Sequence, residues 1–270
     1  NMLIDTVLAS LLPTGSPSWL YVSDRLMQLP LGIFAIAIAT VILPRLSNLF
    51  ASDSREQFSS TLDWSIRLIL LIGLPAVIGL VMLAEPIILT LFERGEFGAQ
   101  DSSMASSSLI ALAFGLLAFM LIKILTPSFF ARQQPKKPMF VALISMVLNA
   151  FLAWLLAFQL GYAHVGLALA SSISAFFTVI TLLILLYKDK VYKSSKGWIY
   201  FLFRMLIASS VLILLINFFS QEVEYLRQIS EFSRFVYIFK IVLIGMVGYF
   251  LSLWILGLRI KDFSNTDVFN

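Results

Sequence analysis

Seven apolar runs, each long enough to cross a lipid bilayer, constrain the fold of this chain more than any other feature. A helix needs about 20 mostly apolar residues to span the hydrocarbon core. The runs are Ser18–Leu43, Trp64–Leu83, Leu109–Phe130, Met139–Leu160, Val165–Tyr187, Trp198–Phe219 and Phe235–Leu258. The hydrophobic content of 60% exceeds the roughly 45–50% that is usual for soluble domains. We therefore predict an all-α membrane protein, a polytopic bundle of transmembrane helices.

A shorter apolar stretch, Met2–Leu12, precedes the first run. It is too short to cross a bilayer, and it has neither a basic start nor a small-residue cleavage site, so we do not expect a signal peptide. We interpret it as the end of a helix whose beginning lies outside this sequence. Cysteine is absent, which excludes disulfides, thiolate metal sites and a cysteine nucleophile.

Basic residues gather in every second connection between the predicted spans. The opposite connections hold Arg94, Arg227 and Arg234 together with a group of acidic residues. The positive-inside rule places the basic connections, and with them the C-terminus, in the cytoplasm. Topology thus explains the net charge of +4. The basic residues do not form a stripe interleaved with aromatics, so the sequence does not indicate nucleic-acid binding. The basic connections carry eleven of the nineteen Lys and Arg residues: Arg45, Arg55, Arg132, Lys136, Lys137, Lys188, Lys190, Lys193, Lys196, Arg259 and Lys261.

Three connections stand out by their composition. Gln133–Pro138 contains two prolines, which cannot continue a helix. Glu85–Asp101 is the longest connection on the acidic side, and EPIILTLFERGEF within it predicts a short interfacial helix. Lys188–Gly197 is polar enough to form a cytoplasmic linker. We expect this linker to divide the chain into a helix bundle, two additional transmembrane helices and a cytoplasmic tail, residues 1–187, 198–258 and 259–270.

Five basic residues fall within the predicted spans: Arg25, Arg67, Lys123, Arg204 and Lys240. A charge at the bilayer centre costs at least about 2.5–3.5 kcal/mol, so each position needs a reason. Arg67, Arg204 and Lys240 lie near span ends, and we expect their long side chains to reach the interface in a structural role. Lys123 lies deeper, and a structural and a functional role both remain open for it.

Arg25 lies about two turns inside the outer end of its span. With about 100° per residue, Ser18, Tyr21, Arg25 and Gln28 share one helix face, whereas Asp24 points elsewhere. One interpretation is an interhelical salt bridge. The other is a cation that faces a water-filled cavity and receives an anion, since intramembrane charges usually mark a pathway and a guanidinium suits phosphate oxygens.

Pro30 and Gly32 follow on the same span and predict a bend, a device suited to a transporter that rocks between two openings. Asp5 and Asn149 offer oxygen ligands for a hard cation such as Na⁺, although ordinary interhelical hydrogen bonds are the alternative. His164 is expected to be a turn or packing residue. The sequence contains no catalytic motif, so we do not expect an enzyme.

Several segments together resemble one family. SWLYVSDRLMQLPLGIFAIAIATVILPRLS is similar to the signature helix of the MurJ/MviN family of lipid II flippases, members of the MOP exporter superfamily. DWSIRL, LFERGEF, KILTPSFFARQQPKKP and HVGLALA match later landmarks in the same order. The resemblance covers nearly the whole chain, while the last two spans match mainly by position and hydropathy.

The resemblance implies two six-helix lobes and two extra helices, of which this chain would form the second lobe, with its first helix truncated, and the extra pair. It also implies a cationic cavity for the lipid headgroup, with Arg25, Asp24, Ser18 and Gln28 on the cavity helix. Asp5 and Asn149 correspond to a cation site of some members, so Na⁺ is a possible coupling ion and no other cofactor is expected. Ala153, one turn after Asn149, supplies no side-chain ligand.

The function that the resemblance implies is alternating-access flipping of lipid II, an undecaprenyl-pyrophosphate-linked peptidoglycan precursor, across the bacterial inner membrane. Its expected partners are this lipid, the membrane lipids and the missing N-terminal lobe. One alternative is a flippase for another polyprenyl-linked saccharide or a multidrug exporter of the same superfamily. Another is a membrane enzyme acting on polyprenyl lipids, which would need a carboxylate or histidine pair near a membrane surface.

Overall fold

The computed structural model describes residues 2–258, with side chains for residues 6–258. In this range, seven helical segments are long and apolar enough to cross a membrane, which confirms the seven predicted spans. Helices suit lipid because they satisfy every backbone polar group internally. The segments are Ser16–Ala51, Arg55–Met82, Ala99–Ala131, Lys136–Gln159, Ala163–Lys188, Trp198–Phe219 and Glu231–Ile255.

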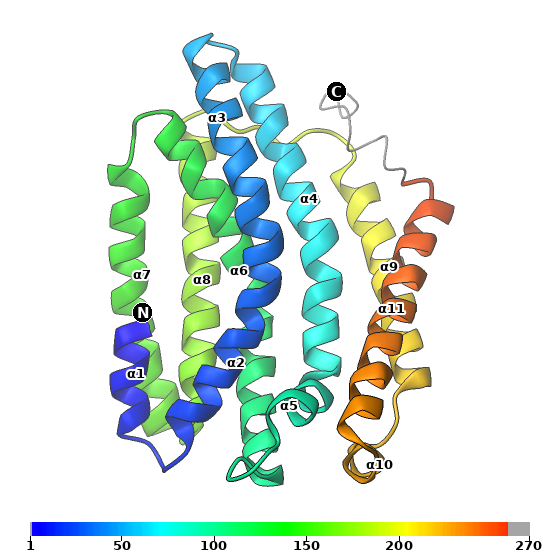
Figure 1. Ribbon diagram of the computed structural model, residues 1–270. Helices are drawn as coiled ribbons and strands as arrows, with labels where there is room; N and C mark the ends of the chain where they lie inside the picture. The colour runs from blue at the N-terminus through cyan, green and yellow to red at the C-terminus, as the bar shows by residue number, and fades with distance from the viewer. Residues whose placement is uncertain (1, 259–270) are drawn as a thin grey trace.

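Five of these segments are single helices and two contain a π-helical part (Figure 1). The single helices are α4 (Arg55–Met82), α6 (Ala99–Ala131), α8 (Ala163–Lys188), α9 (Trp198–Phe219) and α11 (Glu231–Ile255). The composite segments are α2 (Ser16–Pro30) with η1 (Leu31–Ile36) and α3 (Ala37–Ala51), and α7 (Lys136–Trp154) with η2 (Leu155–Gln159). Three shorter helices are α1 (Met2–Ser10), α5 (Ala84–Phe92) and α10 (Val223–Gln228). Helix α5 is the short helix predicted in the longest acidic connection.

The first membrane segment bends where the sequence predicts a bend. Pro30 ends α2, and the six residues of η1 form a π-helix before α3 begins. Proline lacks a backbone donor, and kinks arise at proline and at π-helical turns. Figure 1 shows α2 and α3 running in different directions on either side of η1.

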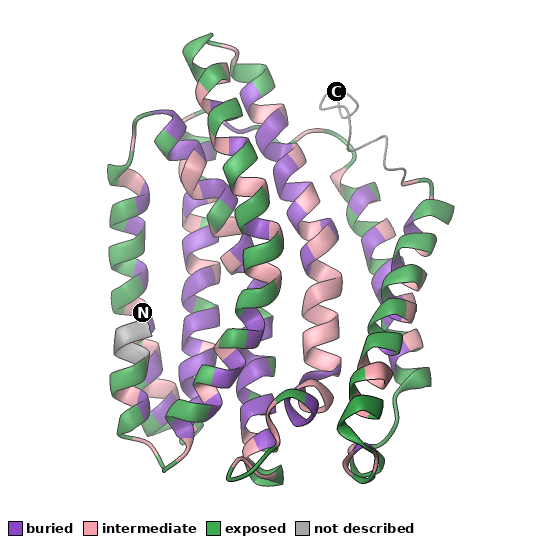
Figure 2. Cartoon of the chain, in the orientation of Figure 1, coloured by how far each residue is buried: buried purple, intermediate pink, exposed green. Residues whose placement is uncertain are grey.

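Helices α6 and α8 form the centre of the bundle. Buried residues make up 56% of the most apolar window of α6 and 50% of that of α8, against 22–33% in the other five segments (Figure 2). The two helices approach closely at Gly115, where an added Cβ atom would lie 2.7 Å from the Cα atom of Ser172. Small residues at such contacts let membrane helices pack backbone to backbone.

Helices α9 and α11 form a separate pair that lies beside α4 (Figure 1). Their buried side chains, including Phe201, Leu212 and Leu253, form a core with Leu71 of α4 that is distinct from the main core. The Tyr249 hydroxyl donates to the backbone oxygen of Leu71 at 3.0 Å. The predicted domain boundaries are not tested by this packing and stay a prediction.

The segment between α8 and α9 is fastened to α4. Asp63 on α4 accepts hydrogen bonds from Tyr192 Oη (2.6 Å), Trp198 Nε1 (2.8 Å) and Ser195 Oγ. It also pairs with Arg67 Nε at 3.0 Å, and both side chains are at most 2% exposed. Arg67 thus has the structural role expected of it, and it also donates to Ser195 Oγ at 2.6 Å. The expectation that its side chain reaches the interface is wrong, because it is buried against a carboxylate one helical turn away.

The connections at the two ends of the bundle differ in charge. We call the end that carries the α3–α4, α6–α7 and α8–α9 connections the basic end, and the end with α5 and α10 the acidic end. At the acidic end, Arg227 of α10 lies 3.3 Å from Glu85 of α5 and 3.4 Å from Glu93, the residue after α5. Arg94 and Glu231 form a second, solvent-exposed ion pair at 2.9 Å, which links the start of α11 to the segment after α5.

Candidate functional site

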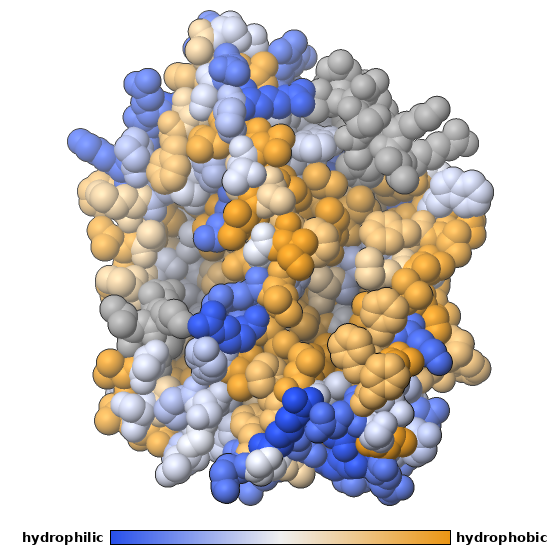
Figure 3. All heavy atoms as spheres, in the orientation of Figure 1, coloured by the Kyte–Doolittle hydropathy of each residue, from blue (hydrophilic) through white to orange (hydrophobic). Residues whose placement is uncertain are grey.

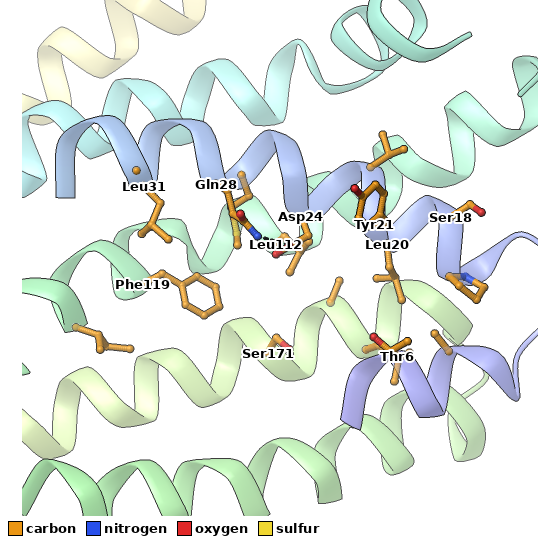
Figure 4. A pocket seen from close by; sticks show the side chains of 18 of the residues that line it. Thr6, Ser18, Leu20, Tyr21, Asp24, Gln28, Leu31, Leu112, Phe119 and Ser171 are labelled. Atoms are coloured by element: carbon orange, nitrogen blue, oxygen red, sulfur yellow. Dashed lines mark hydrogen bonds between the residues drawn. The ribbon is translucent and has the colours of Figure 1, made fainter. Parts of the chain in front are cut away.

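A cavity of about 920 Å³ lies between α1, α2, η1, α6 and α8 (Figure 4). Most of its lining is apolar, including Leu20, Leu31, Leu112 and Phe119. A small set of polar side chains interrupts this lining: Thr6, Ser18, Tyr21, Asp24, Gln28, Lys123 and Ser171. An apolar pocket with a few convergent polar groups is the usual form of a ligand site.

Asp24 and Gln28 form the polar centre of the α2 wall. Gln28 Nε2 donates a hydrogen bond to Asp24 Oδ2, and both side chains line the cavity (Figure 4). The expectation that Asp24 points away from the polar stripe is wrong. Residues four apart lie on neighbouring parts of a helix face, so Asp24 belongs with Gln28. In Figure 3 a hydrophilic group interrupts the largely hydrophobic face at the position of α2.

Arg25 is not among the residues that line the cavity. Its exposed side chain places the guanidinium carbon 4.9 Å from the centre of the Tyr21 ring, which does line the cavity. The predicted stripe of Ser18, Tyr21, Arg25 and Gln28 is therefore shifted around the helix. Three of its four residues reach the cavity, and Arg25 lies at the edge beside Tyr21.

Lys123 is the cation that lies inside the cavity lining. It comes from α6, is exposed to the cavity, and has no ion pair among the described residues. The sequence left its role open, although its depth within a span was a signal, since ionisable groups inside membrane segments are usually functional. The structure thus places a cation and a carboxylate on different walls of one cavity.

Three contacts at the acidic end hold α2 in place beside α6 and α8. Trp19 Nε1 donates to Asp101 Oδ1 at 2.7 Å, and Ser23 Oγ donates to the backbone oxygen of Ala105 at 2.7 Å. The Trp19 ring meets the ring of His164 edge-on, with centroids 4.7 Å apart. Gly15, with φ at 101°, brings the chain over Trp19, where an added Cβ atom would lie 2.6 Å from the indole ring. His164 thus has the packing role expected of it.

The predicted cation site is only partly described. Asn149 is fully buried on α7 and does not line the cavity, and Ala153, one turn further, is also fully buried and has no side-chain oxygen. Asp5 lies in α1, but its side chain is outside the described residues. A sodium site at Asp5 and Asn149 therefore stays a prediction.

The chain is similar to known proteins along nearly its whole length. The family model described as "Lipid II flippase MurJ" matches residues 1–254. A "Probable lipid II flippase MurJ" from Vibrio cholerae is 41% identical over 268 residues, covering 97% of this chain and 50% of that protein. A protein of the same description from Haemophilus influenzae is 41% identical over 265 residues, 96% of this chain and 51% of its own length. The chain therefore spans about half the length of these curated relatives.

Solved structures agree with these relatives. The structure described as "Lipid II flippase MurJ, inward closed conformation" superposes with a TM-score of 0.78 and 26% identity, over 98% of this chain and 51% of that one. An inward-facing multidrug resistance transporter of the MATE family in the MOP superfamily gives a TM-score of 0.59 at 16% identity, over 80% of this chain and 50% of its own. The second similarity shows the fold alone.

Proposed function

Because this chain belongs to the lipid II flippase MurJ family, we propose that the protein containing it flips lipid II from the cytoplasmic to the outer leaflet of the bacterial inner membrane. The chain would form the second six-helix lobe, with α9 and α11 as the additional pair. Alternating access would expose the cavity first to one side and then to the other. No bond is made or broken in such a step, so we infer a transporter and not an enzyme.

The observation that carries this proposal is the cavity with Lys123 and Asp24 on its walls. A lipid-linked saccharide with a pyrophosphate needs a polar site inside the membrane, and desolvated charges are costly without partners. Lys123 suits phosphate oxygens as a compact charge. Asp24 and Gln28 offer acceptors and donors for the hydroxyl and amide groups of a sugar–peptide headgroup.

Arg25 would act at the edge of this cavity. Its stacking on Tyr21 leaves the guanidinium exposed, so it can present a charged fork to phosphate from the cavity rim. We propose that residues of the other lobe complete this contact, since the chain spans about half the length of its relatives. Ser18 and Tyr21 would contribute hydroxyl groups to the same wall.

We further propose an orientation in the membrane and a set of partners. The basic end would be cytoplasmic, with the C-terminus on the same side, by the positive-inside rule. Lipid II, the surrounding lipids and the other lobe would be the partners, without nucleic acid. Na⁺ would be a coupling ion if the side chain of Asp5 completes a site with Asn149.

Rescue of flippase-depleted bacteria by the full-length protein tests the proposal. We expect Lys123→Ala and Arg25→Ala to lose rescue at normal protein levels, while Arg25→Lys retains part of it. Lys240→Ala is the matched control, because Lys240 is an exposed lysine of α11 that does not line the cavity. Full rescue by both alanine variants at the cavity would contradict the proposal, as would failure of the unaltered protein.

A further inference from the structure

A second cavity, of about 270 Å³, lies at the basic end between the ends of α3, α6 and α8. It shares no lining residue with the α2 cavity. About 10–15 Å³ of such space holds one water molecule, so the basic-end pocket has room for a small polar group with its hydration. Six of its ten lining residues are polar or charged: Asp53, Arg55, Arg132, Gln134, Asp189 and Lys190.

The three helices end around this pocket in the same way. Each one closes with a left-handed residue that is not glycine: Asp53 (φ 51°), Gln133 (φ 56°) and Lys190 (φ 55°). The next amide then bonds back into the last helical turn. These bonds are Ser54 N to Leu49 O (2.9 Å), Gln134 N to Phe129 O (2.9 Å) and Val191 N to Leu186 O (3.1 Å). Turn amides thus cap one carbonyl of each helix.

Arg132 supplies a buried donor that has no acceptor. Its side chain is only 2% exposed. Its Nε atom donates to Ser128 O at 3.3 Å and its Nη1 atom to Asp189 Oδ2 at 3.0 Å. The Nη2 atom is buried and finds no hydrogen-bond partner among the described residues. An unpaired donor on a buried charge is unfavourable. The side-chain oxygen of Gln134, which lines the same pocket, is likewise buried without a hydrogen-bond partner among the described residues. A group that accepts from Arg132 and donates to Gln134, as a singly protonated phosphate does, would satisfy both atoms.

Asp189 is not a free acceptor for that donor. Lys137 Nζ lies 2.6 Å from its carboxylate. Burial works to raise the pKa of Asp189, but the hydrogen bonds from Lys137 and Arg132 outweigh it and lower the pKa. The carboxylate therefore stays ionised and is already shared by two cations.

The other two cations that line the pocket, Arg55 and Lys190, are free to contact a bound anion. Arg55 pairs with Asp53 at 3.1 Å, but both side chains are more than 80% exposed, and such surface pairs are weak. The Lys190 side chain has no ion pair among the described residues. The lining holds three cations and two carboxylates, Arg55, Arg132 and Lys190 against Asp53 and Asp189, a net charge of +1 that Lys137 raises to +2.

We propose that the basic-end pocket binds a phosphate group, either of an anionic lipid or of a small soluble phosphate compound. Arg132 Nη2 would donate from the floor, and Arg55 and Lys190 would close over the group from the rim. Phosphate accepts several charge-assisted hydrogen bonds, and basic pockets between transmembrane helices at a membrane surface suit lipid headgroups. The half-exposed ring of Phe50 at the pocket edge gives acyl chains an apolar contact. Bound phosphate would tie three helix ends together, and this site does not depend on the proposed function.

Thermal unfolding of the full-length protein in phosphatidylcholine nanodiscs tests the site. One arm adds inorganic phosphate against chloride at equal ionic strength, and the other adds phosphatidylglycerol to the bilayer. We expect the unfolding midpoint to rise in a saturable way in one arm or both, because ligands that bind only the folded state stabilise it. A rise with inorganic phosphate would show that a soluble phosphate compound can occupy the pocket. A rise with phosphatidylglycerol alone would show that the pocket takes the headgroup of an anionic lipid.

Paired variants separate the pocket from general electrostatics. Arg55→Gln with Lys190→Gln removes the two rim cations and should weaken the apparent affinity about tenfold. Lys188→Gln with Lys193→Gln removes two exposed charges from the same end, outside the pocket lining, and should change it less than about twofold. The proposal is overturned if neither ligand stabilises the unaltered protein, or if the control pair loses as much affinity as the rim pair.

Discussion

Asp63 shows what a single buried charge does in this protein. Its carboxylate accepts hydrogen bonds from side chains of α4, of the α8–α9 connection and of α9: Arg67, Tyr192, Ser195 and Trp198. Arg67 in turn lies over the Trp198 ring, 4.9 Å from its centre. A buried ion pair adds little net stability by itself, but removal of one partner leaves the other charge without compensation. Asp63 is therefore the residue on which the junction depends.

Asp63→Asn should destabilise the protein by about 3–5 kcal/mol, because it leaves the Arg67 guanidinium buried without a counter-charge. The measurements are the unfolding midpoint of the full-length protein and the rate of trypsin cleavage at Lys193 and Lys196. The matched control is Asp53→Asn, whose partner Arg55 is exposed, and we expect a change within about 0.5 kcal/mol. Equal effects of the two substitutions would show that the buried network does not hold the junction.

The polar stripe of α2 shows how far sequence places single residues. Helical periodicity brought Ser18, Tyr21 and Gln28 to one face, and all three line the cavity. It did not show where the stripe is centred, since Asp24 and Arg25 differ by only about 100° around the helix. That centre is set by which face packs against α6 and α8, where Ser23 and Trp19 make their contacts. The sequence of α2 alone does not show which of its faces packs against α6 and α8.

At the scale of elements, the contact between α6 and α8 sets the spacing of the bundle. Ser172 Oγ donates to Ala111 O at 2.7 Å, on the same stretch of α6 where Gly115 meets Ser172. An added Cβ atom at Gly115 would meet Ser172 Oγ at 2.6 Å and Ser172 Cα at 2.7 Å. Because the Cα atom belongs to the backbone of α8, rotation of the serine side chain alone does not relieve the contact.

Gly115→Ala should therefore destabilise the protein by about 1–3 kcal/mol, the range found when atoms are forced into a packed core. The control is Gly79→Ala on α4, where an added Cβ atom meets nothing within 4 Å. We expect that substitution to be neutral or slightly stabilising, since alanine favours helix over glycine by about 1 kcal/mol. Unfolding midpoints of both variants in one detergent provide the comparison, and a neutral Gly115→Ala would contradict the close contact.

Elements were predicted more completely than their contacts. Hydropathy identified each membrane segment found among residues 2–258, because lipid imposes helix length and backbone pairing on the chain. It also identified the short helix α5. Pro30 predicted a bend, but not that six residues would form a π-helix. The Lys188–Gly197 segment was expected to be a polar linker, and its attachment to Asp63 depends on a partner more than 120 positions away. Local pattern does not reveal such a pairing.

At the scale of the whole molecule, different kinds of ionic contact hold the α9–α11 pair at its two ends. At the basic end the Asp63 network is buried. At the acidic end the attachments are the Arg227 cluster with Glu85 and Glu93, and the exposed pair of Arg94 and Glu231. Salt screens the exposed Arg94–Glu231 pair most, the Arg227 cluster less, because its side chains with Glu85 and Glu93 are 15–32% exposed, and the buried Asp63 network least. The two attachments should therefore respond differently to ionic strength.

Raising salt from about 0.1 M to about 1 M shortens the Debye length from about 10 Å to about 3 Å and should loosen only the acidic end. Spin labels can be placed at introduced cysteines at Leu91 of α5 and Tyr225 of α10, both exposed. No cysteine of this chain competes for the label, and any cysteine elsewhere in the full-length protein is replaced by serine. We expect the distance distribution of this pair to broaden with salt in the full-length protein. A control pair at Gln57 and Ser194, at the basic end, should stay unchanged, and equal broadening at both ends would refute the difference.

A rod that is clamped at one end and weakly held at the other acts as a lever. Helix α9 begins at the Asp63 network with Trp198 and has 22 residues, which gives a length of about 33 Å at about 1.5 Å per residue. A tilt of about 10° at the clamped end would displace the far end by about 6 Å, more than the ~3.5–4.0 Å separation of carbon atoms in contact. A small tilt about the Asp63 network would thus move the acidic end of the α9–α11 pair away from α5, so the buried junction at Trp198 acts as the fulcrum that amplifies the tilt.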